Sequence, residues 1–326
     1  MCACLFERSE NTCIKASTHL SANCVKSYNG IDIFIFFMLY LWRKQRRQIV
    51  KIAIISDIHS NYQALKSVIE DCEKKGVEKI FCCGDIIGKG CNANKCVNLI
   101  RQKCEVVVRG NTDTRFTDDP EKFKDNLVEY NRIKNNQSLL NEENFTFIKN
   151  LPFSYEFYLS GNLVRIFHAT PTSEFGFIND YDTNMIKKYA IFLGSDLTPT
   201  QNIADIVIFG HLHYSSMLRF YNKIMINCGS VGSSACPLYD ESLNSSANEI
   251  TQAHYLIIEG KYNSNERNNV SFSFESVCYD IEKELEDNDE TNNTDLEGYK
   301  NELRLGKYRN IDRIKNVYIE NGYTFG

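Results

Sequence analysis

The sequence predicts an α/β fold with a parallel sheet, and two observations support this prediction. From Lys51 onward, short runs of β-branched and other apolar residues alternate with longer segments in which apolar residues recur at helical spacing. Strand–helix–strand units of this length require right-handed crossovers, which place successive strands parallel and in the same sheet. A chain of 326 residues is also long enough to bury a large core, as one big domain or two modest ones.

The first part of this alternation contains three expected strands and four expected helices. The strands are Lys51–Ser56, Glu78–Cys83 and Cys104–Val108. The helices are Tyr62–Lys75, Ala93–Gln102, Asp125–Leu140 and Glu142–Leu151. The first helix shows the pattern most clearly, because one face collects its apolar residues Leu65, Val68, Ile69 and Cys72.

The second part of the chain is expected to be richer in strands. Two of them are Leu163–Phe167 and Asp205–Phe209. Met217–Tyr221 and Ile224–Ile226 surround Asn222-Lys223, a turn signal that predicts a hairpin. Two more strands, which we expect to join a second, antiparallel sheet, are His254–Glu259 and Val270–Cys278.

The two ends of the chain differ in composition from the predicted domain, which we expect to span residues 50–281. Residues 1–49 contain an apolar run, Ile33–Trp42, that is shorter than the roughly 20 residues needed to cross a bilayer. We interpret residues 1–49 as a poorly ordered leader; the alternative is an uncleaved signal anchor, because basic residues follow the run. Residues 282–326 are expected to be an acidic linker, with eight acidic residues in Glu282–Glu297, and a basic helical tail.

Charge and cysteine content exclude some functions and favour one compartment. The formal net charge of −5 argues against a protein that binds duplex nucleic acid, which normally has a basic face. The 13 cysteines are scattered and odd in number, and several fall inside apolar strands. They are typical of buried thiols in a reducing compartment rather than of a disulfide framework. We therefore expect a cytoplasmic protein that does not associate with a membrane.

Five short motifs carry the chemistry, and each follows a predicted strand. They are Asp57-Ile58-His59, Gly84-Asp85-Ile86-Ile87-Gly88, Gly110-Asn111-Thr112-Asp113, His168, and Gly210-His211-Leu212-His213. Because ligands bind at the carboxyl ends of strands in open α/β sheets, we expect these motifs to converge. A mixture of carboxylate, imidazole and amide ligands suits divalent ions such as manganese, iron or zinc.

The motifs contain enough ligands for two ions. Asp57 and His59 are two residues apart on one loop, so both can turn toward one ion, and Asp85 can offer one oxygen to each of two ions. The remaining expected ligands are Asn111, His168, His211 and His213. Two ions about 3.5–4 Å apart lower the pKa of a bridging water and hold both oxygens of a displacement at phosphorus. The sequence therefore predicts a two-metal phosphoesterase.

In this order the motifs resemble those of the calcineurin-like metallophosphoesterase superfamily, from about Val50 to Ile281. Ser56–Asn61 and Asn227–Gly232 look like the small bacterial and archaeal phosphodiesterase branch. The resemblance implies a four-layer sandwich, in which helices flank two mixed β-sheets, and a binuclear metal centre. It assigns one metal to Asp57, His59 and His213. It assigns the other to Asn111, His168 and His211, with Asp85 bridging. Manganese is the first choice, with iron, zinc and nickel as alternatives.

The resemblance implies hydrolysis of a small phosphodiester, such as a nucleotide, by a hydroxide that bridges the two metals. The same centre would suit two alternatives, a phosphomonoesterase or a dinucleoside-polyphosphate hydrolase. A third alternative is a scaffold, because a eukaryotic retromer subunit uses this fold for assembly. Such a scaffold tends to lose a metal-site histidine, whereas every ligand position is filled here, so we favour an enzyme. The oligomeric state is left open.

One position departs from the family pattern. The family commonly has a histidine at the position of Thr112, where it is thought to protonate the leaving oxygen. A threonine hydroxyl does not ionise near neutral pH and cannot act as an efficient general acid. Asp113 is the candidate donor, with a structural role as the alternative. Asn61 and Lys89, on loops next to ligands, are candidates for binding the substrate phosphate, with solvated loop residues as the alternative.

Overall fold

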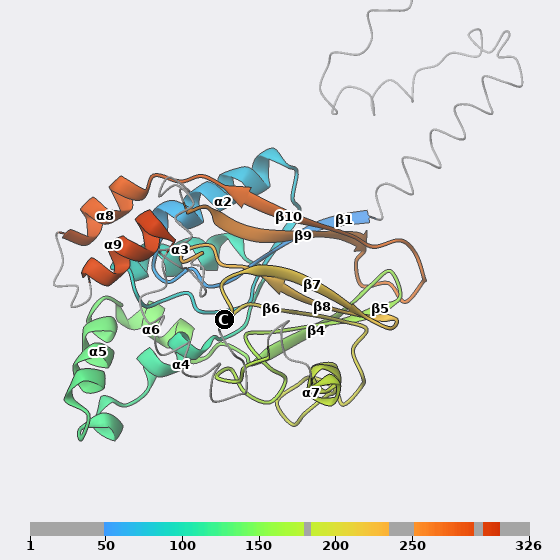
Figure 1. Cartoon of the computed structure of the whole chain (residues 1–326), viewed down its shortest axis with the longest axis horizontal. Helices are drawn as coiled ribbons and strands as arrows, with labels where there is room; N and C mark the ends of the chain where they lie inside the picture. The colour runs from blue at the N-terminus through green and yellow to red at the C-terminus, as the bar shows by residue number, and fades with distance from the viewer. Residues whose placement is uncertain (1–48, 179–183, 235–250, 290–295, 307–326) are drawn as a thin grey trace, which may run out of the picture. The chain divides into compact units, whose positions relative to one another are not determined.

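The computed structural model describes residues 49–178, 184–234, 251–289 and 296–306 (Figure 1). The fold below is that of the unit that begins at Ile49. The predicted leader and most of the basic tail lie outside the described residues. Within the described ranges, no helix is both long enough and apolar enough to span a membrane.

The first sheet has five strands in the order β10-β9-β1-β2-β3. Its strands are β1 (Ile49–Ile55), β2 (Lys79–Cys82), β3 (Val106–Val107), β9 (Ala253–Lys261) and β10 (Ser271–Val277). β1, β2 and β3 are parallel as predicted, whereas β9 runs antiparallel to β1, and β10 to β9. The expectation that β9 and β10 form a second sheet is therefore wrong. They extend the first one, because Ile258 and Leu256 pair with Ile52 and Ile54 and continue the same apolar face.

The second sheet also has five strands, in the order β4-β5-β6-β8-β7. Its strands are β4 (Ser154–Leu159), β5 (Asn162–Phe167), β6 (Ile206–Phe209), β7 (Ser215–Phe220) and β8 (Lys223–Cys228). β5, β6 and β8 are parallel, and the edge strands β4 and β7 are antiparallel to their neighbours. The predicted hairpin is present as β7–β8, but its turn is Tyr221-Asn222, one residue earlier than expected.

The two sheets pack face to face and are covered by helices. Between them lies a core to which alternate residues of both sheets contribute, among them Ile54 and Phe81 from the first and Ile166 and Ile208 from the second. The outer face of the first sheet packs against α2 (Tyr62–Lys74), α3 (Ala93–Lys103) and α6 (Glu142–Lys149). The short α7 (Met185–Ala190) lies on the outer face of the second. The four-layer sandwich of two mixed sheets is therefore confirmed.

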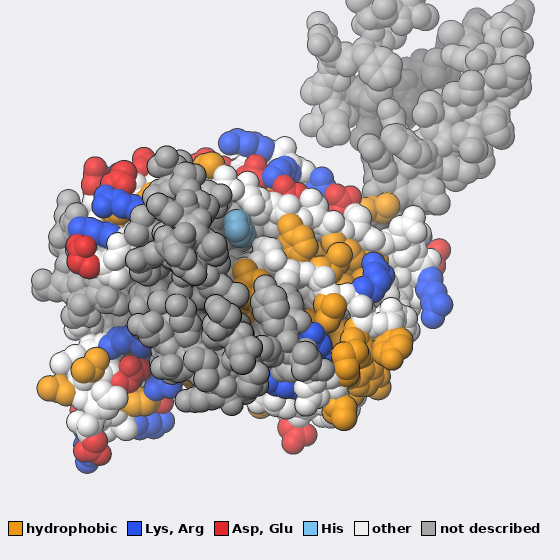
Figure 2. Space-filling model, in the orientation of Figure 1, with side chains coloured by type: hydrophobic (Ala, Val, Ile, Leu, Met, Phe, Trp, Pro, Cys, Tyr) orange, Lys and Arg blue, Asp and Glu red, His pale blue; other side chains and the backbone are white. Residues whose placement is uncertain are grey.

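The outer layer is thinner over the second sheet than over the first. Between α7 and the hairpin β7–β8 lies an open apolar groove, and apolar side chains gather on this face (Figure 2). Ile186 and Tyr221, at the rim of the groove, are 84% and 86% exposed. α7 therefore covers only part of the second sheet.

Five further elements complete the described fold. They are α4 (Asn111–Thr117), the 3₁₀ helix η2 (Pro120–Phe123), α5 (Leu127–Ser138) and the pair α8 (Ile281–Asp289) and α9 (Leu296–Leu305). In the acidic segment Glu282–Glu297, expected to be a solvated helix end that runs into a linker, the described residues include the helix α8, one face of which is buried. α8 contacts α2 and α9, and Glu284 and Leu285 are buried, as are Tyr299 and Leu303 on α9.

Candidate metal centre

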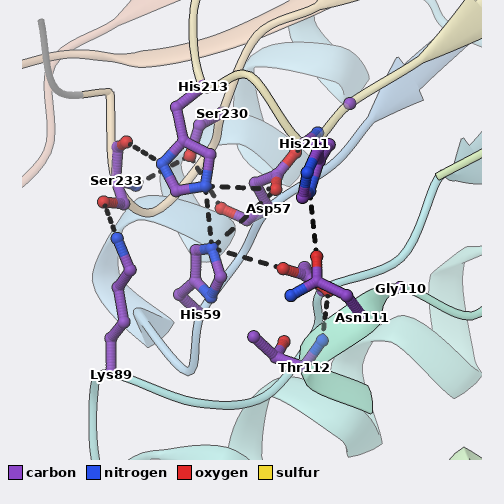
Figure 3. A network of polar contacts seen from close by, with 12 residues as sticks. Asp57, His59, Lys89, Gly110, Asn111, Thr112, His211, His213, Ser230 and Ser233 are labelled. Carbon is purple, nitrogen blue, oxygen red and sulfur yellow. Dashed lines mark hydrogen bonds and ion pairs between the residues drawn. The ribbon is translucent and has the colours of Figure 1, made fainter. Parts of the chain in front are cut away.

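All seven predicted ligands lie at one edge of the sandwich, on the loops after the parallel strands. Those from the first sheet follow β1, β2 and β3 and are Asp57, His59, Asp85 and Asn111. Those from the second sheet follow β5 and β6 and are His168, His211 and His213. Because both sheets present the carboxyl ends of their parallel strands at this edge, side chains up to 156 residues apart converge (Figure 3).

The first group of ligands contains Asp57, His59 and His213, whose ligand atoms lie within 4.8 Å of one another. The two imidazole Nε2 atoms are 3.0 Å apart. Asp57 Oδ1 lies 3.3 Å from His213 Nε2 and 3.8 Å from His59 Nε2. All three residues are at most 7% exposed. They are placed to share one ion.

The second group contains Asn111, His168 and His211. Asn111 Oδ1 lies 2.9 Å from His168 Nε2 and 2.9 Å from His211 Nδ1. Asn111 and His211 are partly exposed, so this group faces the open side of the site. Asp85 lies between the two groups. Its Oδ2 is 3.7 Å from His59 Nε2 and its Oδ1 is 3.4 Å from His168 Nε2, so one carboxylate oxygen faces each group.

The hydrogen bonds of His213 show that the first group fits a cation. His213 Nδ1 lies 2.7 Å from the carbonyl oxygen of Ser233, which can only accept a hydrogen bond, so Nδ1 donates. In the neutral ring the lone pair is then on Nε2, which faces Asp57 Oδ1. Among the described residues, that buried carboxylate oxygen has no hydrogen-bond partner. Two facing acceptors repel each other unless a cation lies between them.

The same arrangement occurs in the second group. His168 Nδ1 donates to the carbonyl oxygen of Cys83 at 2.8 Å, which leaves the lone pair of the neutral ring on Nε2, facing Asn111 Oδ1. Backbone carbonyls commonly orient metal-binding histidines in this way. The residues of both groups therefore fit divalent metal ions, as the sequence predicts.

Burial and charge shift the pKa values of these ligands. Burial raises the pKa of Asp57, but the charge of His213 and its hydrogen bond to Asp57, present when that ring carries a proton instead of facing a metal, outweigh burial and hold the pKa of Asp57 below its ordinary value. Burial lowers the pKa of His211 to about 3 and, with Lys89, holds the pKa of His59 well below its usual range. At each of these three positions the deprotonated form, which is the form that binds metals, is favoured.

The backbone at the site is unusual. Five of the seven ligands have positive φ, between 50° and 68°, although none is a glycine; they are Asp57, His59, Asp85, His211 and His213. Residues with side chains rarely adopt this left-handed conformation, and it concentrates at functional sites where the surrounding structure imposes it. The loops therefore hold the ligands in place at a cost in local backbone strain.

Two glycines allow the loops to approach one another. A Cβ atom at Gly110 would overlap the carboxylate of Asp85, and one at Gly210 would overlap Asp57 Oδ2. Neither glycine has positive φ. Both are therefore required by close packing against a ligand rather than by backbone conformation.

Asp113 lies behind the ligands. Its Oδ1 accepts hydrogen bonds from the backbone N–H groups of Ile86 and Ile87, and its Oδ2 accepts one from Gly110. The side chain is fully buried, and burial followed by the nearby Asp85 raises the pKa of Asp113 to about 7. These contacts support the structural alternative, in which Asp113 joins two ligand-bearing loops, over proton donation to a leaving group.

Thr112 is also engaged within the protein. Its hydroxyl donates to the carbonyl oxygen of Ile87 at 2.8 Å, and its backbone N–H donates to Asp85 Oδ1 at 2.8 Å. The position where the family commonly has a histidine therefore helps to hold Asp85 in place.

The two side chains predicted to bind the substrate phosphate, those of Asn61 and Lys89, also form hydrogen bonds within the protein. Asn61 is fully buried and caps α2: its Oδ1 accepts from the N–H of Ala64, and its Nδ2 donates to the carbonyl oxygen of Gly232. Lys89 lies near the first metal group, but its Nζ donates to Ser233 Oγ at 2.8 Å and pairs with Glu302 at 3.2 Å. Both side chains support loops of the site, and neither is a solvated loop residue.

Sequence reasoning missed the supporting role of the loop after β8. Ser230 Oγ donates to the carbonyl oxygen of Asp57 at 2.8 Å, and the carbonyl oxygen of Ser233 orients His213. Asn227 donates to the carbonyl oxygen of Gly210. The signal available in the sequence was Asn227–Gly232, a polar and glycine-containing segment directly after a strand.

Comparisons with known proteins agree with this geometry. The family model of the calcineurin-like phosphoesterase superfamily domain matches residues 50–239. An uncharacterised protein of Methanocaldococcus jannaschii is 35% identical over 191 residues, which cover 56% of this chain and 76% of that protein.

Two solved structures share the fold. A metallophosphoesterase from Sphaerobacter thermophilus has a TM-score of 0.56 and 22% identity. A hypothetical protein from Pyrococcus horikoshii has a TM-score of 0.59 and 18% identity. Each similarity covers 79% of this chain and 99% of the other. Since the family model spans more than half of the chain and the described site contains every expected ligand, the protein belongs to the calcineurin-like phosphoesterase superfamily.

Proposed function

We propose that this protein is a metal-dependent phosphodiesterase that hydrolyses a small phosphodiester. The observation that carries the proposal is the convergence of seven candidate ligands, in which Asp57, His59 and His213 cluster, Asn111 lies against His168 and His211, and Asp85 lies between. A scaffold would not need carboxylate, amide and imidazole ligand atoms that face one another, so the geometry favours an enzyme. Family membership supports phosphoester hydrolysis, and the preference for a diester is our inference.

The candidate ligands would bind the two ions in two groups. Asp57, His59 and His213 would hold one ion, and Asn111, His168 and His211 the other, with Asp85 shared. When bound, two such ions supply an activated water and neutralise charge that develops on the phosphoryl oxygens. The backbone carbonyls that orient His168 and His213 hold the ligands rigidly, so that little reorganisation is needed during the reaction.

Leaving-group protonation is the weak step in this site. Thr112 does not ionise, and its hydroxyl is bonded to the carbonyl oxygen of Ile87. Both oxygens of Asp113 accept backbone hydrogen bonds behind the ligands. We therefore infer that the preferred substrate carries a leaving group that departs without strong general acid catalysis, such as an aryl or other acidic alcohol.

An aromatic ring at the site supports a substrate with an aromatic group, such as a nucleotide. Phe177 is 40% exposed, and its ring centroid lies 6.4 Å from that of His211 in an edge-to-face arrangement. An exposed aromatic ring beside the metal ligands can stack on a nucleobase or on an aryl leaving group.

The proposal is tested by turnover of metal-depleted protein after reconstitution with Mn²⁺, Fe²⁺, Zn²⁺ or Ni²⁺. The substrates are bis(p-nitrophenyl) phosphate, p-nitrophenyl phosphate and a dinucleoside polyphosphate, and Asp85→Ala serves as the inactive control. We expect the diester to be hydrolysed with the highest kcat/KM. If one of the other two substrates had the higher kcat/KM, the protein would be a phosphomonoesterase or a dinucleoside-polyphosphate hydrolase instead. Absence of turnover by the metal-loaded protein would contradict an enzymatic function.

A further inference from the structure

A buried carboxylate on the C-terminal helix α9 is connected to the metal centre. The Glu302 side chain has no exposed surface, and its Oε2 and Oε1 lie 3.2 and 3.4 Å from Lys89 Nζ. Lys89 Nζ also donates to Ser233 Oγ at 2.8 Å (Figure 3). The carbonyl oxygen of the same Ser233 accepts the hydrogen bond from His213 Nδ1. Three contacts therefore link Glu302 to a predicted metal ligand.

A second set of contacts connects the same helices to the loop of His59. Gly90 donates its backbone N–H to the carbonyl oxygen of His59 at 2.9 Å. A Cβ atom at Gly90 would lie only 3.0 Å from the Tyr299 hydroxyl of α9 and from the carbonyl oxygen of Ser60. This loop therefore packs directly beneath α9, and Tyr299 in turn donates to Glu284 of α8 at 3.4 Å.

The charges of this network are interdependent. A buried carboxylate keeps its negative charge when a cation lies beside it, and Lys89, with 12% of its side chain exposed, lies beside Glu302. Removing the negative charge would take away one partner of the Lys89 ammonium group beside the candidate metal ligands. Lys89, whose own φ is 58°, would then be less firmly held, and so would Ser233.

We propose that Glu302 is a positioning residue for the metal centre, acting through Lys89 and Ser233 on His213. The proposal rests on the two-metal centre proposed above, and it adds that α9, which lies beyond the region matched by the family model, completes one half of that centre. The other half should be independent of Glu302, because His168 is oriented by Cys83 and its partner Asn111 begins α4.

The test is a calorimetric titration of the metal-depleted full chain with Mn²⁺, comparing wild type, Glu302→Gln and Glu284→Gln. Glu284 is the matched control, because it is also a buried helical glutamate of this layer. It accepts from Gln63 of α2 and from Tyr299, so its replacement tests the packing contact with the loop of His59 and leaves the Lys89–Ser233 contacts unchanged. We expect Glu302→Gln to weaken binding of one of the two ions about 10–100-fold, the range typical of residues that support metal ligands. Glu284→Gln should change neither affinity more than about twofold.

A second variant covers the case in which Glu302→Gln fails to fold. Lys89→Gln removes the other charge without altering α9 and should weaken the same ion. In the double variant the effects should sum to less than the two single losses, because Glu302 and Lys89 contact each other and both contact the Ser233 hydroxyl, at 3.4 and 2.8 Å. Unchanged affinities in Glu302→Gln and Lys89→Gln would overturn the proposal. So would additive effects, or an equal loss in Glu284→Gln.

The outcomes also separate this proposal from the proposed function. A wild-type protein that binds two ions but hydrolyses no phosphoester contradicts the function and leaves the role of Glu302 open to the same titration. If the wild type is active but Glu302→Gln binds both ions with unchanged affinity, the positioning role alone is overturned. A wild type that binds no ions contradicts both.

Discussion

The Nε2 atoms of His59 and His213 face each other at 3.0 Å, although the two residues are 154 positions apart and come from different sheets. His213 donates through Nδ1, so its Nε2 offers a lone pair to this contact. Burial, followed by the charge of Lys89, keeps His59 neutral by lowering its pKa. The contact is therefore favourable only when a cation or a shared proton lies between the rings, and this determines how the protein should respond to metal.

Metal removal should destabilise the protein. Ligand atoms that repel each other in the metal-free state are held together by a bound ion, and a ligand present at 100 times its Kd stabilises the folded state by about 2.7 kcal/mol. We expect Tm to fall on treatment with a chelator and to recover with Mn²⁺, and elemental analysis to give close to two ions per chain. A Tm indifferent to both treatments, with no metal found, would contradict the metal centre.

Asp85→Ala should be the most damaging single substitution in the site. It removes the carboxylate that lies between both groups and leaves the N–H of Thr112 without its acceptor. We expect metal content to fall below one ion per chain and turnover to fall at least about 100-fold. Circular dichroism should show an unchanged fold. Two ions retained with near-normal turnover would show that Asp85 does not bridge.

Thr112→His should help poor leaving groups most. If leaving-group protonation is weak, the rate of the wild type should depend steeply on leaving-group pKa, fast for aryl diesters and slow for alkyl ones. General acid catalysis typically contributes about 10²–10⁴-fold, so an added imidazole should flatten this dependence measurably. The measurement is kcat/KM for a series of diesters with graded leaving groups. A shallow dependence in the wild type would mean that another group already donates the proton.

Phe177→Leu should weaken the binding of aromatic substrates. Phe175→Leu is the matched control, because Phe175 is similarly exposed, at 47%, but its ring faces Arg115 rather than a metal ligand. We expect KM for an aryl or nucleoside ester to rise about tenfold in Phe177→Leu, the loss of one stacking contact, with metal content unchanged. Equal effects in both variants would remove Phe177 from the substrate site.

Glu284 should make stability depend on pH. Burial raises the pKa of Glu284 to about 7, although the N–H of Gln63 and the amide of Asn288 partly offset it. A raised pKa contributes stability that is complete below the ordinary value near 4.5 and is lost as pH rises through about 7. The shift corresponds to roughly 3 kcal/mol at most.

The measurement is the free energy of unfolding in denaturant for metal-free wild type and Glu284→Gln, from pH 4.5 to 8. The wild type should lose stability relative to the variant across this range, because only the wild type must ionise a buried carboxyl. Taking the difference between the two proteins removes the titration of histidines. If the difference in the free energy of unfolding between the two proteins did not change with pH, burial would not raise the pKa of Glu284.

The sequence predicted the elements well and their partners less well. The strands β1 and β6 were predicted correctly. Both of their faces are buried, so their sequences are short, continuous apolar runs that are easily recognised. β4 was missed because Ser154–Leu159 includes Glu156, yet Glu156 pairs across the strands with buried Arg165 at 2.6 Å. Alternation identified β9 and β10 as strands but could not show which sheet they join, since that depends on pairing with β1.

At the site, residue types could be predicted and conformations could not. The motifs located all seven candidate ligands, because carboxylate, amide and imidazole groups after strands are recognisable in sequence. Positive φ at Asp57 or His213 has no such signal, since aspartate and histidine are ordinary in other loops. The connection from Glu302 to Lys89 crosses 213 residues and arises only when α9 packs on the domain.

The origin of the ligands in two separate sheets has a consequence for folding. The first sheet contributes Asp57, His59, Asp85 and Asn111, whereas all three remaining imidazoles come from the second. Neither set can surround an ion alone, so full affinity appears only after the sheets have docked. Metal capture should thus be a late event of the folding reaction, and its rate would report when the two halves of the sandwich come together.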